Sequence, residues 1–164
     1  MSAQQFAYIE EYVRKADRAV TSGADYETYL DIDSVIDWII LHELTNNSDS
    51  GFRRSCFFTK QAGGKLQMGP VWDFDLAFGN FSKDNHAYDT WATTGGDYLG
   101  TTWFAYLMKD ARFNTKLKAR WNAVKDDLLS TAVQDIDSIS RSLAVSQVSN
   151  FIRWDILNKR AGYQ

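Results

Sequence analysis

The feature that most constrains this chain is the run from 69 to 80, GPVWDFDLAFGN, which sets two aspartates close together among bulky apolar side chains. Asp73 and Asp75 follow Pro70, the only proline in the sequence. A carboxylate that is even partly buried costs free energy unless a cation or hydrogen-bond donors compensate it. The run therefore predicts either a divalent metal or charged ligand beside the acids, or a turn whose aspartates accept backbone N–H bonds.

Local patterns upstream of this run predict a helix, a polar loop and a hairpin. Residues 31–44 carry apolar side chains at helical spacing behind an acidic N-cap. Residues 45–51 have no periodicity and are rich in residues that favour loops. Residues 55–59 and 65–68 are typical of short strands, and the glycines of 62–64 supply the turn between them.

The hairpin has a consequence for three acids that are distant in the sequence. Because it leaves one polar loop and enters the next, it can bring Asp49 close to Asp73 and Asp75. Phosphoryl transfer uses such a set, since one aspartate positions or deprotonates the acceptor while metal ligands neutralise charge on the transferred phosphate. Magnesium prefers oxygen ligands and commonly takes one or two protein carboxylates. An EF-hand loop is excluded, because no acids repeat at alternate positions toward a distant glutamate.

At these residues the chain resembles the spore-coat protein H (CotH) family of atypical, secreted protein kinases. The resemblance rests on residues 44–80, chiefly on a TNN-x-D loop, a GGKL hairpin and the GPVWDFDLAFGN run. Weaker similarity continues through Trp103-Phe104, Phe113, Arg120-Trp121 and 150–154. The resemblance implies transfer of phosphate from ATP to a protein hydroxyl with Mg²⁺ (or Mn²⁺). It also implies an extracellular location, at a bacterial cell surface or spore coat.

The resemblance further implies roles for individual residues. Asp49 matches the catalytic-loop aspartate, Asp73 the magnesium-binding aspartate, and Asp75 a partner of that ion or of a second one. Residues 54–55 are Arg and Ser where many family members place a metal-binding Asn. Asn80 is then the remaining candidate ligand.

Basic residues around the hairpin are candidates for binding the phosphates of ATP. Arg53 and Lys65 are the predicted cofactor contacts, and Arg54 and Lys60 lie near them in the sequence. The alternative is ordinary charge at the edge of a hairpin.

A nucleotide clamp is missing from the pattern before residue 31. No glycine-rich strand-turn-strand and no Val-Ala-x-Lys equivalent occurs there, and Lys15 falls in an amphipathic helical pattern typical of a solvated residue. We therefore expect residues 1–164 to form one partial domain, a kinase-like C-terminal lobe whose nucleotide-binding lobe lies outside this sequence. Such a lobe is expected to be inactive alone.

Composition predicts a single α+β unit that is mostly helical. Hydrophobic residues make up 45% of the 164 and aromatics 15%, which allows a sizeable core. No run approaches the roughly 18 apolar residues of a membrane-spanning helix. The formal net charge of -3 provides no basic footprint for nucleic acid. Cys56 is the single cysteine, so neither a disulfide framework nor a zinc site is predicted.

Two further features leave alternatives open. His42, on the apolar helix, either donates to the backbone of the Asp49 loop or packs as an uncharged ring. Residues 81–100 have little helical period and take the place of an activation or substrate loop. Aromatics in and just after this segment can shape an acceptor groove or display a glycan-binding surface: Tyr88, Trp91, Tyr98 and Trp103. The competing function is thus a catalytically silent surface adhesion or glycan-associated module.

Beyond residue 100 the patterns predict helices. Residues 103–108 begin a helix that Asp110 ends, and 113–121 begin another with apolar residues four apart. Ser130 or Thr131 is predicted to cap a long final helix.

Overall fold

The structure is a computed structural model that describes residues 1–47, 55–78, 91, 102–157 and 159. Within these ranges it is mostly helical with one antiparallel two-stranded sheet, which confirms the predicted α+β class. The elements are α1 (Ala3–Ser22), the 3₁₀ turn η1 (Tyr26–Thr28), α2 (Ile32–Leu44), β1 (Phe58–Lys60), β2 (Leu66–Met68), α3 (Trp103–Leu107), α4 (Ala111–Ser142) and α5 (Ala144–Arg153). None of the helices described is long and apolar enough to cross a membrane.

The first two long helices begin where the sequence supplies a cap. The Ser2 hydroxyl accepts from the Gln5 N–H at 3.2 Å, while the Gln5 side chain accepts from the Ser2 N–H at 2.8 Å. α1 ends at Gly23, whose φ of 68° suits a residue without a Cβ. Asp31 caps α2 by accepting from the Ser34 N–H at 3.2 Å, which confirms the acidic N-cap.

The hairpin forms as predicted but its first strand starts later. β1 and β2 pair antiparallel, with Phe58 opposite Met68 and Lys60 opposite Leu66. Ser55 has a φ of 53°, which is a left-handed rather than an extended conformation. The expected strand over 55–59 therefore begins only at Phe58.

The hairpin is fastened to the start of α2. The Leu66 N–H donates to the Tyr29 carbonyl and the Leu66 carbonyl accepts from the Asp31 N–H, each at 2.8 Å. The Met68 N–H donates to Ser34 Oγ at 2.9 Å. Leu66 and Met68 are both buried, so β2 lies against the helix with its apolar side chains inward.

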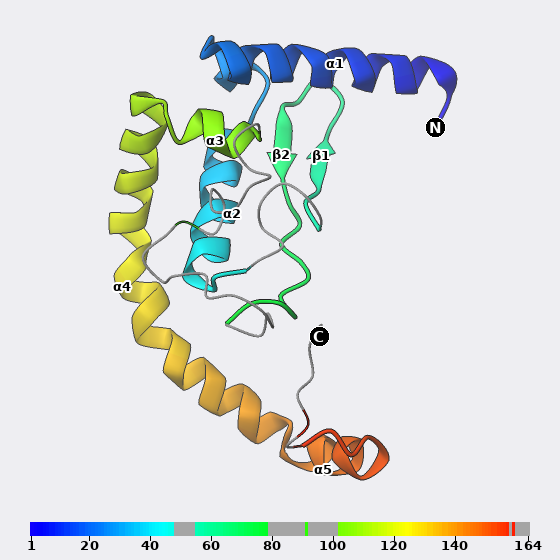
Figure 1. Cartoon of the computed structure of the whole chain (residues 1–164), viewed down its shortest axis with the longest axis vertical. Helices are drawn as coiled ribbons and strands as arrows, with labels where there is room; N and C mark the ends of the chain where they lie inside the picture. Colours follow the sequence, from blue (N-terminus) through cyan, green and yellow to red (C-terminus); the bar gives the residue numbers. More distant parts are fainter. Residues whose placement is uncertain (48–54, 79–90, 92–101, 158, 160–164) are drawn as a thin grey trace.

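The core lies where α2 meets β2, α3 and the first half of α4. In Figure 1, α2 stands between α4 and the hairpin, with α1 across one end. Apolar residues of α2 are buried on most of its circumference, as expected of a central helix. Trp38 of α2 stacks on Phe104 of α3, with ring centroids 5.2 Å apart. α3 is joined to α1 by the Trp103 indole N–H, which donates to Asp17 Oδ1 at 2.8 Å.

α4 is one continuous helix where the sequence predicts two. Asp110 is its N-cap and accepts from the Arg112 N–H at 2.7 Å. Ser130 and Thr131 cap no helix, and that prediction is wrong. Both hydroxyls donate to the Asp127 carbonyl, at 3.2 and 3.0 Å. A hydroxyl that bonds back to a carbonyl three or four residues earlier leaves the helix unbroken. The final helix is α5, which begins later.

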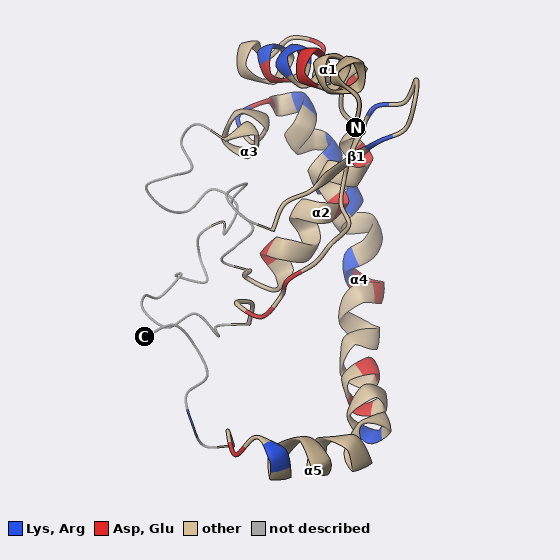
Figure 2. Ribbon diagram, turned by 90° about the vertical axis from the view of Figure 1, so that its right-hand side faces the viewer, with Lys and Arg blue, Asp and Glu red and all other residues tan. Residues whose placement is uncertain are grey.

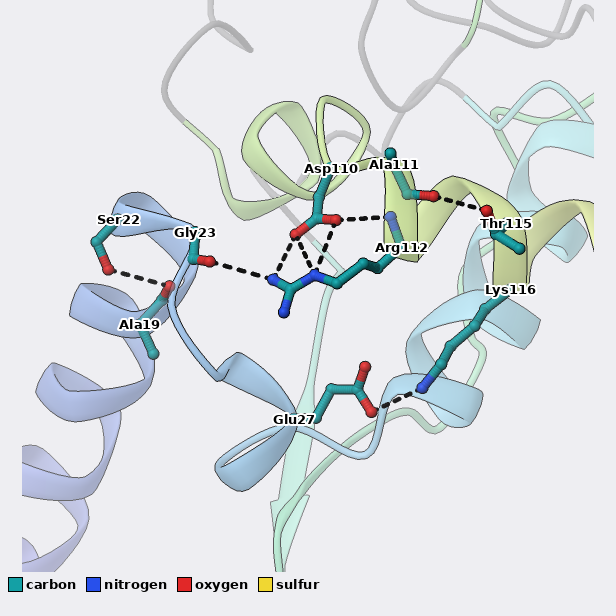
Figure 3. A network of polar contacts seen from close by, with 9 residues as sticks. All are labelled: Ala19, Ser22, Gly23, Glu27, Asp110, Ala111, Arg112, Thr115 and Lys116. Atoms are coloured by element: carbon teal, nitrogen blue, oxygen red, sulfur yellow. Dashed lines mark hydrogen bonds and ion pairs between the residues drawn. The ribbon is translucent and has the colours of Figure 1, made fainter.

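A polar network joins the start of α4 to the chain between α1 and α2 (Figure 3). Arg112 holds Asp110 through Nε and Nη2, at 3.2 and 2.7 Å, and also donates to the Gly23 carbonyl at 3.1 Å. Lys116 pairs with Glu27 at 2.7 Å. Hydrogen bonding from Arg112 lowers the pKa of Asp110 to about 2. These contacts fix the point at which α4 begins.

The second half of α4 and all of α5 extend away from the body of the molecule (Figures 1 and 2). α5 buries none of its residues. Large apolar side chains are exposed along this extension: Leu129, Val133, Ile136, Ile139, Leu143, Val145, Val148 and Ile152.

Candidate functional site

At the C-terminal end of α2, an aromatic stack runs from the core to residues 69–80, the acidic run. The His42 ring lies between Trp38 and Phe74, with ring centroids 3.7 and 4.7 Å away. His42 is 1% exposed, and within the described residues neither of its ring nitrogens has a hydrogen-bond partner. Burial lowers the pKa of His42 to about 4, so the ring is neutral at pH 7. Of the two interpretations, this geometry supports the packed ring.

Two hydrogen bonds tie the acidic run to the corner that follows α2. Asn47 Nδ2 donates to the Asp73 carbonyl at 3.0 Å, and the Phe78 N–H donates to the Thr45 carbonyl at 2.7 Å. Asn47 is fully buried, and its own N–H donates to the His42 carbonyl at 3.0 Å. The segment from Asp73 to Phe78 is therefore held against the end of α2 at both of its ends.

Unusual backbone conformations gather at the same place. Within the described residues, the non-glycine residues with positive φ are Asn46 at 47°, Ser55 at 53°, Asp73 at 67° and Phe78 at 55°. Each such residue costs on the order of 1–3 kcal/mol unless its surroundings impose the conformation, and such residues cluster at functional sites. All of them lie in or beside the segments that contact Asp73.

The Asp73 carboxylate is exposed and held from one side. Ser55 Oγ donates to Asp73 Oδ2 at 2.9 Å. The described structure gives this carboxylate no bond from a backbone N–H, so the predicted turn with backbone donors is not what holds it. Asp75 is exposed as well. Ser55 occupies the neighbourhood in which the family resemblance expects an Asn.

The acidic run is less buried than its apolar composition predicts. Trp72 is 55% exposed and Phe78 is 78% exposed, so the expectation of acids in a buried run is wrong. Ala77 is buried, and its N–H closes a turn on the Phe74 carbonyl at 3.1 Å. Because the chain turns here, only part of the run faces the core.

Three predicted site residues lie outside the described residues: Asp49, Arg53 and Asn80. The convergence of Asp49 with Asp73 and Asp75 therefore stays a prediction. In the part of the chain that the structure describes, no three His, Cys, Asp or Glu side chains are grouped to hold a metal ion.

The hairpin lysines lie at the turn. Lys60 Nζ donates to the Gly64 carbonyl at 2.7 Å and lies 4.2 Å from the centroid of the Tyr12 ring. Lys65 is exposed beside the same turn. The pairing register places this turn at one end of the hairpin and the exit toward Asp73 at the other. The structure thus does not bring either lysine together with Asp73.

An apolar pocket of about 500 Å³ lies between α2 and α4. Its lining is Ile39, Ile40, Glu43, Leu44, Trp91, Asn114, Leu117, Lys118 and Trp121. Trp91 thus lines a hollow, as an aromatic of a groove would. Trp103 is buried in the core and does not shape a groove, which corrects that part of the prediction. Tyr88 and Tyr98 lie outside the described residues.

Sequence reasoning did not find the role of Asn47. A carboxamide directly after a helix reads as loop composition, and the contact with Asp73 joins positions 26 apart. No local pattern in the sequence signals this contact.

Comparison with known proteins bears on this site. The family model described as CotH kinase protein matches residues 2–164. Searches of the curated proteins and of the solved structures each gave no match. The matched range includes the end of α2, the hairpin and the acidic run.

Proposed function

Because the chain belongs to the CotH kinase family, we propose that it carries the acidic half of a phosphotransfer site that moves phosphate from ATP to a protein hydroxyl. The observation that carries this proposal is the way in which Asp73 is held. Its backbone is clamped by Asn47, and its exposed carboxylate is oriented by Ser55. Backbone strain of this kind clusters at functional sites, and an exposed carboxylate oxygen is a ligand that Mg²⁺ prefers.

The proposed roles divide the acids between acceptor and metal. Asp49 positions or deprotonates the acceptor hydroxyl, and Asp73 ligates Mg²⁺ or Mn²⁺ with help from Asp75 and Asn80. Carboxylate and carboxamide oxygens are donors that magnesium prefers, so the donor set fits. When bound, the ion neutralises charge on the transferred phosphoryl group.

ATP is the proposed phosphate donor, and its contacts are only partly supplied here. Arg53 remains the proposed phosphate contact, whereas the position of Lys65 at the hairpin turn does not support the same role. We propose that a nucleotide-binding lobe outside these 164 residues supplies the remaining contacts with ATP. For the 164 residues alone we expect little or no turnover.

The test is a phosphorylation assay on the full-length protein. It uses labelled ATP, Mg²⁺ or Mn²⁺ and candidate acceptor proteins, beside Asp49→Asn and Asp73→Asn. Asp137→Asn on exposed α4 is the matched control. Label is expected with the unchanged protein and the control, and loss of label with the two site variants. Equal label in all four proteins would remove the kinase proposal.

A specific observation favours the second candidate, a silent glycan-associated or adhesion module. Phe57 and Trp72 form an exposed edge-to-face pair, with ring centroids 6.1 Å apart, beside the acidic run. Exposed aromatic faces are typical of surfaces that bind sugars. A module of this kind predicts no label in the assay above, together with quenching of Trp fluorescence by oligosaccharides that Trp72→Ala removes.

We further propose an extracellular location at a bacterial cell surface or spore coat, which is inferred from the family resemblance alone. Labelling of intact cells with a reagent that does not cross membranes tests it, since a surface protein is labelled before lysis.

A further inference from the structure

Asn47 links the buried end of α2 to the backbone of Asp73. Its carboxamide is fully buried and donates across 26 positions to the Asp73 carbonyl. A buried carboxamide is costly when its donor is unpaired, so the structure strongly favours keeping this bond. The bond therefore fixes the conformation of Asp73, whose φ of 67° needs support from its surroundings.

Ser55 holds the side chain of Asp73, whereas Asn47 holds its backbone. Its hydroxyl donates to Oδ2 of Asp73, and within the described residues Oδ1 accepts no hydrogen bond and joins no ion pair. One oxygen is thus held in place and the other is left open at the surface. A carboxylate prepared in this way suits a cation that takes one oxygen from each carboxylate, as Mg²⁺ usually does.

We propose that Asn47 and Ser55 are positioning residues for Asp73, Asn47 by fixing its backbone and Ser55 by presenting its free Oδ1 to a divalent cation. The inference rests on the proposed function, because it concerns the metal ligand of that site. Residues that orient a metal ligand without touching the metal commonly change metal affinity by 10–100-fold when they are replaced.

The test follows metal binding to this chain directly and needs no activity. MnCl₂ is titrated into the ¹⁵N-labelled chain, and the paramagnetic broadening of each backbone amide signal is recorded. In the unchanged chain the amides of Asp73 and Asp75 are expected to broaden first. With Asn47→Ala and with Ser55→Ala, the same broadening is expected to need roughly tenfold more Mn²⁺.

Matched controls remove similar bonds elsewhere. Asn114 Nδ2 donates to the Met108 carbonyl at 2.7 Å, and Ser146 Oγ donates to the Leu143 carbonyl at 3.1 Å. Asn114→Ala and Ser146→Ala should leave the Mn²⁺ titration unchanged. Should Asn47→Ala unfold the chain, Ser55→Ala carries the test, because its side chain is not in the core.

The outcomes separate this inference from the proposed function. Selective broadening in the unchanged chain that persists at the same Mn²⁺ concentration in both variants would overturn the inference alone. No selective broadening at Asp73 in the unchanged chain would overturn the inference and also the metal role of Asp73 in the proposed function. A second readout, hydrogen exchange of the Phe78 amide, should quicken with Asn47→Ala and not with Ser55→Ala.

Discussion

The buried ring of His42 predicts a specific dependence of stability on pH. Burial lowers its pKa from 6.5 to about 4. The folded chain then binds fewer protons at this ring than the unfolded chain between those values, so the free energy of unfolding rises with pH. The contribution of the neutral His42 ring to the free energy of unfolding is fully present above pH 6.5 and is lost as pH falls toward 4.

The size of the effect follows from the two pKa values. One pKa unit corresponds to about 1.36 kcal/mol, so the full loss is roughly 3 kcal/mol, of which about 2 kcal/mol falls between pH 7 and pH 5. For a domain with a total stability of about 5–15 kcal/mol, this is a large fraction.

Urea unfolding at pH 7, 6 and 5 measures it. His42→Phe keeps an aromatic ring between Trp38 and Phe74 but cannot bind a proton, so its stability should fall about 2 kcal/mol less than that of the unchanged chain between pH 7 and 5. His86→Asn removes the other histidine and is the control, because only two histidines occur in the chain. Superimposed pH profiles for the unchanged chain and His42→Phe would refute the account of a buried, neutral ring.

Three further predictions concern the helices. Leu117→Ala in the core should lower the free energy of unfolding, measured with urea, by about 2–5 kcal/mol. Ile136→Ala lies farther along the same helix at a side chain that is 65% exposed, and it should change that free energy by less than about 0.5 kcal/mol. Equal losses in the two variants would contradict the exposed extension of α4. Ionised Asp110 stabilises the fold above pH 4 and loses that role when it is protonated, because Arg112 lowers its pKa. Asp110→Asn keeps a capping side chain without the charge, so thermal melts of this variant should show a smaller fall in stability between pH 4 and pH 2 than those of the unchanged chain. Gly23→Ala meets no atom within 4 Å yet must adopt a φ of 68°, so it should cost about 1 kcal/mol by urea unfolding, and an unchanged midpoint would argue against the left-handed end of α1.

Patterns carried by neighbouring residues predicted much of the fold. The cap at Asp31, the apolar helix after it and the glycine-containing hairpin turn are found where the sequence places them. These features depend on caps, periodicity and turn chemistry, which act over a few residues. The prediction of a cap at Ser130 or Thr131 failed because a hydroxyl can satisfy itself inside a helix, and composition cannot tell the two cases apart.

The site was predicted less completely. Asp73 and Asp75 were identified from their apolar surroundings, but the structure exposes both acids and turns neighbouring Trp72 to solvent. The sequence could not show this, because apolar residues in a tight turn point in several directions and only the contacts of the turn decide which are buried.

The sequence by itself determined the capped apolar helix α2, the hairpin turn and which acids stand near one another along the chain. It did not determine where β1 begins or that α4 is one continuous helix. Only the tertiary structure decided that Asn47 reaches Asp73, that Ser55 holds its carboxylate and that His42 is buried between two rings. Helix caps and turns arise from interactions between near neighbours, which a pattern records. Contacts between positions 18, 26 or 32 apart depend instead on how the hairpin packs against α2, and no local pattern encodes that packing.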